Sequence, residues 1–102
     1  MTGKYRLSEK AISDLEKIWF YTFNKWSVEQ ADRYHRLIIG EIEYIADNFE
    51  LSRKMDYVRR GYRMTKVKSH LIFLKKSGDD KIDIIRILHQ NMDIENRLNE
   101  YE

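Results

Sequence analysis

Residues 8–34 read SEKAISDLEKIWFYTFNKWSVEQADRY, and this stretch decides the fold because it contains two helix starts. Ser8 stands before a long run of apolar residues, in the position of an N-cap residue. The apolar residues recur at three- and four-residue steps, which places them on one helix face: Ile12, Leu15, Trp19, Phe23 and Trp26. We therefore predict a helix over residues 9–25 whose apolar stripe, including both tryptophans, faces the core or a protein partner.

A second helix follows almost at once. Ser27 is its candidate N-cap, and Gln30 stands three residues later at the spacing of a capping box. A second apolar stripe continues beyond it through Ala31, Tyr34, Ile38, Ile42, Ile45 and Phe49. Because only residues 26 and 27 separate the two stripes, the sequence predicts an antiparallel helical hairpin.

The second half of the chain changes character and favours strands. Residues 51–61 show no clear period, so we predict a basic loop there. Residues 62–67, 71–75 and 81–88 are rich in β-formers and are separated by turn residues, which indicates an antiparallel meander. Residues 4–7 alternate in polarity, and we expect them to join the same sheet.

The last predicted strand is apolar on both faces, which is typical of a central or covered strand. Simple alternation groups Arg86 with Ile84 and Leu88, and His89 with Ile85 and Ile87 on the other face. The short final helix begins after Asp93, its candidate N-cap, and its apolar residues are Ile94, Leu98 and Tyr101. The predicted order is β-α-α-β-β-β-α, an α+β domain with a helical hairpin packed on one face of the sheet.

Length and composition exclude several classes of protein. A chain of 102 residues holds a single core, so we expect one domain over residues 1–102. The chain has no cysteine, which excludes disulfides, thiolate nucleophiles and cysteine zinc sites. The first residues lack the apolar region of a signal peptide, and no apolar run nears the roughly 18 residues that span a bilayer. We expect a cytoplasmic protein that works away from membranes.

The positive charge is concentrated in one segment. Residues 52–76 carry nine basic groups and one acidic group, whereas the whole chain has a net charge of only +2. Such a block is a footprint for phosphates or for an acidic protein surface. It is equally typical of a solvated sheet edge on which lysine and arginine discourage strand aggregation.

The order of elements and several segments agree with one known family. The matching segments are YRLSEKAISDLEKIWFYTFNKW at 5–26, QADRY at 30–34, GYRMTKVKSHLIFLKK at 61–76 and IIRILHQNMDIENRL at 84–98. Through them the chain resembles the ParE branch of the RelE/ParE superfamily of bacterial toxins along nearly its whole length. It departs from the family's pattern in segment 48–61, where relatives commonly carry prolines and this chain has none.

The resemblance implies a non-enzymatic toxin of a type II toxin–antitoxin system. Toxins of this kind bind DNA gyrase and trap it on cleaved DNA. A small ParD-like antitoxin holds the toxin inactive in a hetero-oligomer, with its C-terminal segment wrapped across the helical hairpin and sheet. The resemblance implies neither a cofactor nor a metal, and the histidines at 35, 70 and 89 lack metal-ligand spacing.

Two other functions remain open at this stage. The ribonuclease branch of the superfamily cleaves messenger RNA at the ribosome, and Arg63, Lys66 and Arg86 are candidate phosphate contacts, with His70 or His89 for proton transfer. Against this, ribonuclease relatives carry a tyrosine, or a histidine–tyrosine pair, just after the last strand, where this chain continues with Gln-Asn-Met after its histidine. The third possibility is an interaction module that has lost its toxicity.

Two sets of residues are our candidates for partner contact. The first would touch gyrase or the antitoxin: Arg59, Arg60, Arg63, Lys66, Arg86, His89 and Met92. The second would form the antitoxin groove: Trp19, Phe23, Tyr62, Met64 and Phe73. Structural roles compete with these: Arg86 is expected to pair with a carboxylate at the sheet surface, and His89 to bond to backbone at the strand end.

Overall fold

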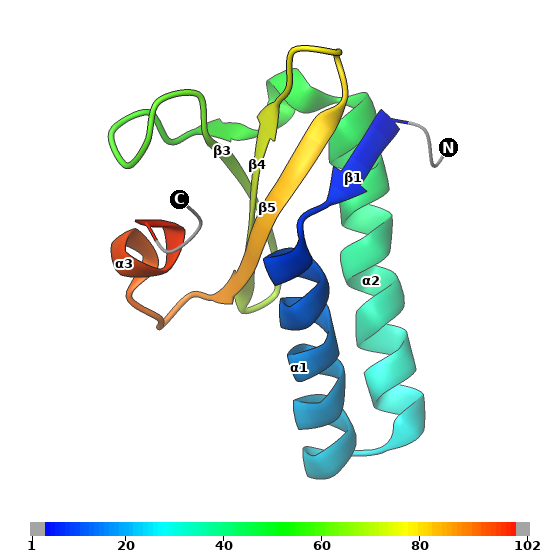
Figure 1. Cartoon of the computed structure of the whole chain (residues 1–102). Helices are drawn as coiled ribbons and strands as arrows, with labels where there is room; N and C mark the ends of the chain where they lie inside the picture. The colour runs from blue at the N-terminus through cyan, green and yellow to red at the C-terminus, as the bar shows by residue number, and fades with distance from the viewer. Residues whose placement is uncertain (1–3, 100–102) are drawn as a thin grey trace.

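The computed structural model describes residues 4–99 and confirms the predicted α+β fold (Figure 1). Its helices are α1 (Glu9–Lys25), α2 (Val28–Asp47) and α3 (Ile94–Asn99), with a short 3₁₀ helix at Phe49–Leu51. Its strands are β1 (Tyr5–Leu7), β2 (Arg53–Lys54), β3 (Arg63–Val67), β4 (His70–Lys76) and β5 (Ile82–His89). Tyr101, which we predicted as an apolar residue of the final helix, lies outside the described residues.

The five strands form one sheet in the order β1-β5-β4-β3-β2. β3, β4 and β5 make the expected antiparallel meander, and β1 joins the sheet by pairing in parallel with β5. Figure 1 shows the α1–α2 hairpin on one side of the sheet and α3 on the other. The central strands are therefore covered on both faces, which explains why β5 is apolar on both.

Each helix of the hairpin starts at the predicted serine. The Ser8 hydroxyl accepts a hydrogen bond from the Ala11 N–H at 3.0 Å and donates one to the Ile85 carbonyl at 2.7 Å. The Ser27 hydroxyl accepts from the Gln30 N–H at 3.1 Å. Both serines satisfy a backbone donor that the first helical turn leaves free, and Ser8 also ties α1 to β5.

Two apolar cores lie on the two faces of the sheet. On the hairpin side, Ile38 and Ile42 of α2 are fully buried against a set of sheet residues that includes Ile72, Leu74 and Ile84. On the α3 side the core has these members: Met55, Tyr62, Phe73, Ile85, Leu88 and Leu98. Fully burying a side chain of this size contributes about 1.5–3 kcal/mol, so both layers stabilise the domain.

A β-bulge in β5 makes our predicted assignment of its faces wrong. Phe73 pairs with Arg86, but the next residue of β4, Leu74, pairs with Ile84, so Ile85 is an extra residue in β5. An extra residue shifts the alternation of every side chain beyond it. Ile84 and Ile87 consequently share the hairpin side, while Ile85 and Leu88 share the α3 side.

The basic loop predicted over residues 51–61 contains regular structure. Arg53 and Lys54 form β2, an edge strand that pairs with Met64 and Arg63. Beyond it, the Asp56 side chain accepts a hydrogen bond from the Gly61 N–H at 2.8 Å, and Gly61 has the positive φ of 83° that glycine adopts without strain. A two-residue strand carries no readable alternation, so the sequence gives no signal for it.

The aromatic part of the α1 stripe is not a core face, so of the two predicted alternatives, core or partner contact, the second stays a prediction for it. The buried residues of α1 are Ala11, Asp14 and Leu15 in its first half, whereas Phe23 is 40% exposed and Trp26 is 67% exposed. Figure 1 shows the reason: the loop end of the hairpin extends beyond the strands. The second half of α1 has no sheet beneath it.

Candidate partner-binding site

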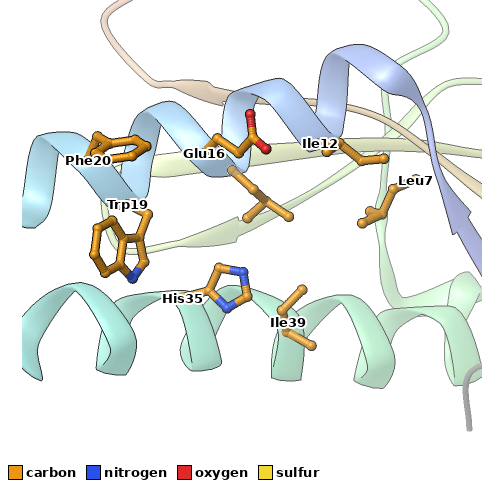
Figure 2. A pocket seen from close by; sticks show the side chains of 8 residues that line it. Leu7, Ile12, Glu16, Trp19, Phe20, His35 and Ile39 are labelled. Atoms are coloured by element: carbon orange, nitrogen blue, oxygen red, sulfur yellow. The ribbon is translucent and has the colours of Figure 1, made fainter. Parts of the chain in front are cut away.

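A groove runs between the two helices of the hairpin (Figure 2). It has a volume of about 400 Å³ and is lined almost entirely by apolar atoms. We call it the hairpin groove; its lining residues are Leu7, Ile12, Leu15, Glu16, Trp19, Phe20, His35 and Ile39. Figure 2 shows Trp19 of α1 and His35 and Ile39 of α2 facing one another across it.

Aromatic contacts hold the wall of the groove in place. The Trp19 ring stacks on Phe23 with centroids 5.4 Å apart and meets Phe20 edge to face at the same distance. The Trp19 ring nitrogen donates a hydrogen bond to the Asp32 carboxylate of α2 at 2.9 Å. Trp19 is therefore ordered by both helices, while Phe20 is 59% exposed beside it. A pre-ordered aromatic surface of this kind is suited to bind an apolar partner segment.

The predicted antitoxin groove is split between the two sides of the sheet. Trp19 and Phe23 lie at or beside the hairpin groove. Tyr62, Met64 and Phe73 belong to the core under α3, where Phe73 is fully buried and Tyr62 nearly so. The structure does not bring these five residues together, because residues 62, 64 and 73 face away from the hairpin.

Sequence reasoning missed Ile12, Phe20, His35 and Ile39 as neighbours in the groove. For the aromatic wall of the groove, the sequence contained one signal. The segment WFYTF at 19–23 places aromatic rings around the helix rather than along one stripe. Such a helix cannot bury all of them against a single neighbour, so some were bound to remain exposed. The pairing with α2 depends on the angle of the hairpin, which the sequence does not specify.

The predicted basic residues divide between internal and surface roles. The Arg63 guanidinium donates to the Ser52 carbonyl at 2.9 Å and lies 4.8 Å from the centre of the Phe49 ring, so it fixes the segment before β2. Arg60 and Lys66 are exposed and remain candidates for partner contact, as does the half-buried Arg59. The exposed β2 residues, Arg53 and Lys54, extend this basic edge of the sheet.

Arg86 is structural, as the competing prediction held. It is only 6% exposed, and its guanidinium donates to both carboxylate oxygens of Asp14, at 2.8 and 3.0 Å. It also donates to the Arg97 carbonyl of α3 at 3.1 Å, while Asp14 accepts the Ile87 N–H at 2.9 Å. In this fold Arg86 joins α1, β5 and α3 and does not present a surface to a partner, so our placing of it among the contact residues is corrected.

The end of β5 has the backbone contacts that were expected of it. His89 is half-buried, and its Nδ1 accepts a hydrogen bond from the Asn91 N–H at 3.1 Å. The Asp93 carboxylate accepts from the Asn96 side chain at 2.7 Å at the start of α3. Met92 is exposed between them, and its contact with a partner stays a prediction.

The residues that a ribonuclease would need do not converge. Arg86 is buried against Asp14, Arg63 is bonded to backbone carbonyls, and Lys66 points to the opposite face of β3 from Arg63. Phosphoryl-transfer chemistry needs its cations and its proton donor around one phosphate. Arg63, Lys66 and Arg86 therefore do not form a common phosphate site in this structure.

Within residues 4–99, no cluster of three or more histidine or acidic side chains is placed to hold a metal ion. None of the helices in this range combines the length and the apolar character that crossing a membrane requires.

Comparison with known proteins gives concordant matches. A family model described as "ParE toxin of type II toxin-antitoxin system, parDE" matches residues 5–94. Toxin ParE1 of Mycobacterium tuberculosis is 39% identical over 98 residues, which cover 96% of this chain and 100% of that protein. Toxin ParE1 of Caulobacter vibrioides is 40% identical over 88 residues, covering 86% of this chain and 90% of that protein.

A solved structure described as "Chromosomal ParDE TA system from P. aeruginosa" contains a chain with the same fold. It superposes with a TM-score of 0.72 and 18% sequence identity, covering 84% of this chain and 96% of that chain. At this identity the likeness establishes the fold.

Proposed function

This chain belongs to the ParE family of type II toxin–antitoxin toxins, and we propose from that membership that it arrests growth by trapping DNA gyrase on cleaved DNA. We further propose that a cognate ParD-like antitoxin neutralises it and that both act in the cytoplasm, where gyrase works. The action is stoichiometric poisoning rather than catalysis.

The hairpin groove is the observation that carries the antitoxin part of this proposal. The exposed Phe20 and the half-buried Trp19 line a groove that an amphipathic segment would fill, and Trp19 is already held in place by Asp32. A partner helix or strand with apolar residues at regular spacing would bury Phe20 and Ile12, which are exposed in the free chain. Burial of such rings commonly supplies most of the affinity of an interface.

The basic edge is the candidate surface for the gyrase–DNA complex. Arg53, Lys54, Arg60 and Lys66 are exposed at one edge of the sheet, in the segment that carries the whole positive excess of the chain. Cationic side chains of this kind attract DNA phosphates with a strong dependence on salt. The hairpin groove and the basic edge are built by different elements, so the two contacts can be changed separately.

The gyrase proposal is tested with purified toxin, gyrase and supercoiled plasmid. We expect linear DNA to accumulate after detergent and protease treatment, and an equimolar antitoxin to prevent it. The Arg60→Glu, Lys66→Glu variant should yield less linear DNA, with the difference from the parent chain greatest at low salt, where charge attraction to phosphates is least screened. Folded toxin that neither produces cleavage nor blocks supercoiling would contradict the proposal, and messenger cleavage in a translating extract would favour the ribonuclease.

The antitoxin proposal is tested by titration calorimetry with the product of the adjacent antitoxin gene. Phe20→Ala should weaken binding at least tenfold, because the ring is exposed and lines the groove. Tyr44→Ala is a matched control, since Tyr44 is an exposed aromatic residue of α2 outside the groove lining. Equal affinity of the two variants would show that the antitoxin binds elsewhere, and tight binding without growth arrest on expression would identify a module that has lost its toxicity.

A further inference from the structure

A second, larger hollow lies at the loop end of the hairpin. The end of α1, the first half of α2, the β3–β4 turn and the end of β5 form it, and its volume is about 680 Å³. We call it the tip cleft and define it by six of its lining residues: Lys25, Trp26, Arg33, Lys68, His70 and His89. These residues come from four separate segments, and folding alone brings them together.

The tip cleft is cationic. Lys25, Arg33 and Lys68 line it, and among the described residues that form its walls none is aspartate or glutamate. All three cations are exposed at the rim, where an anion would reach them without displacing a buried ion pair. A ligand with a compact charge of about −2, such as a phosphate monoester, complements this lining.

The two histidines have one ring nitrogen each already engaged by the protein. His70 Nδ1 lies 2.7 Å from the Tyr34 hydroxyl, and His89 Nδ1 accepts the Asn91 N–H. Because a neutral imidazole carries one proton, His89 carries it on Nε2, which is then a hydrogen-bond donor. Their rings meet edge to face with centroids 5.3 Å apart, at the floor of the tip cleft.

Burial and the neighbouring His89 lower the pKa of His70, while Asp14 acts in the opposite direction. A bound anion would favour the protonated ring and raise this pKa. The His70 ring signals should therefore change when an anion occupies the cleft.

Exposed rings flank the cationic lining. Trp26 is the C-cap residue just after α1 and has most of its surface in solvent. Tyr21 is exposed about one turn earlier, with the Lys25 ammonium 5.7 Å from its ring centre. An aromatic face beside cations is the arrangement that binds a nucleobase by stacking and its phosphate by charge. An acidic peptide would use the cations but would leave the flat ring faces without a matching partner.

We propose that the tip cleft binds a nucleotide, with its phosphate held by Arg33, Lys68 and the histidines and its base stacked on Trp26. The nucleotide is either free or part of a single strand, since both present the same phosphate and base. This inference does not depend on the action on gyrase, because it concerns a different surface and a binding assay with the toxin alone.

The test follows the histidine ring signals by NMR, with tryptophan fluorescence in parallel, on the full chain. The probes are inorganic phosphate, adenosine 5′-monophosphate, a short oligothymidylate and a hexaglutamate peptide. We expect saturable shifts of the His70 and His89 signals with the monophosphate or the oligonucleotide, at least tenfold tighter than with phosphate, and quenching of Trp26. The tighter of the two nucleotide probes identifies the source of the ligand.

The Arg33→Gln, Lys68→Gln variant should lose at least tenfold in affinity, and the matched control is Lys17→Gln, an exposed lysine of α1 outside both the cleft lining and the basic edge. Trp26→Ala should reduce the affinity for the nucleotide to that for phosphate. The proposal is overturned if neither nucleotide probe saturates, if the control loses as much affinity as the double variant, or if the peptide binds more tightly than both nucleotide probes. A normal gyrase result with failed nucleotide binding would refute only this inference.

Discussion

The two halves of α1 differ in burial although they form one continuous helix. In the first half Ala11 and Leu15 are buried, and Asp14 is fixed to Arg86 and to the Ile87 N–H of β5. In the second half Phe20 and Tyr21 are exposed, and Figure 1 shows the loop end of the hairpin extending beyond the strands. We call residues 9–18 the anchored half and residues 19–25 the projecting half.

This difference separates stability from binding along one element. Side chains of the anchored half lower the free energy of the fold, because they leave water and satisfy buried partners. Side chains of the projecting half leave apolar surface in water. This surface adds little to the stability of the isolated chain, but a partner can bury it. Substitutions of buried residues in the anchored half should therefore change unfolding, and substitutions of exposed aromatic residues in the projecting half should change binding.

The largest effect is expected for Asp14→Ala in the anchored half. Its loss leaves the Arg86 guanidinium without its carboxylate and the Ile87 N–H without an acceptor. Breaking a buried pair by removing one partner costs about 3–5 kcal/mol, a large share of the stability of a domain of this size. Urea unfolding followed by circular dichroism measures the loss.

The matched control for this prediction is Lys17→Ala, because Lys17 is exposed in the same half of α1. It should change the free energy of unfolding by no more than about 0.5 kcal/mol. Similar losses in the two variants would mean that the Asp14–Arg86 pair contributes no more than an ordinary surface residue.

The two helix caps give a smaller effect and compare the two ends of the hairpin. Ser8→Ala removes the cap of α1 and the hydrogen bond to the Ile85 carbonyl, a loss of about 2 kcal/mol in total. Ser27→Ala removes only the cap of α2 at the projecting end, a loss of about 1 kcal/mol. Urea unfolding ranks the two, and hydrogen exchange should show faster opening around Gln30 in Ser27→Ala alone. A larger loss at Ser27 would reverse our assignment of which end is anchored.

The sequence predicted the anchored parts of the fold well, because several local signals agreed there. Ser8 and Ser27 start the helices as their capping chemistry requires, and the apolar stripe of α2 through Ile38 and Ile42 is buried as its period indicated. Alternation failed in β5 because the bulge at Ile85 depends on how β4 and β5 pair, which is a property of two strands rather than one.

The candidate site was predicted less completely. Trp19 and Phe23 were identified, but Phe73 and Tyr62 were placed with them although they face α3. The misplacement has a physical cause: an apolar residue in a sheet that is covered on both faces gives no sign of which cover it contacts. The pairing of α1 with α2 across the groove depends on a tertiary angle, so His35 and Ile39 carried no recognisable signal.

A pH dependence is expected at the junction between sheet and projecting end, where His70 contacts Tyr34. Burial lowers the pKa of His70 below the ordinary value of 6.5 in the folded chain. Below pH 6.5 the unfolded chain takes up a proton that the folded chain still rejects, so stability falls as the pH drops toward the folded-state pKa. We expect the free energy of unfolding to decrease less between pH 7.5 and pH 5.5 in His70→Gln than in the parent chain. An equal loss in both would show that other groups cause it.

The smallest effect on stability is expected for Phe20→Ala in the projecting half, the same change that should weaken antitoxin binding. The ring is mostly exposed and contacts Trp19 at its edge, so its removal should change the free energy of unfolding by at most about 0.5 kcal/mol. Urea unfolding of Phe20→Ala and Asp14→Ala under the same conditions compares their losses of stability. A loss above about 1.5 kcal/mol would mean that the ring is part of the folding core, and the weaker antitoxin binding would then reflect a damaged fold. Unchanged stability with weaker binding is the result that assigns the projecting half to a partner.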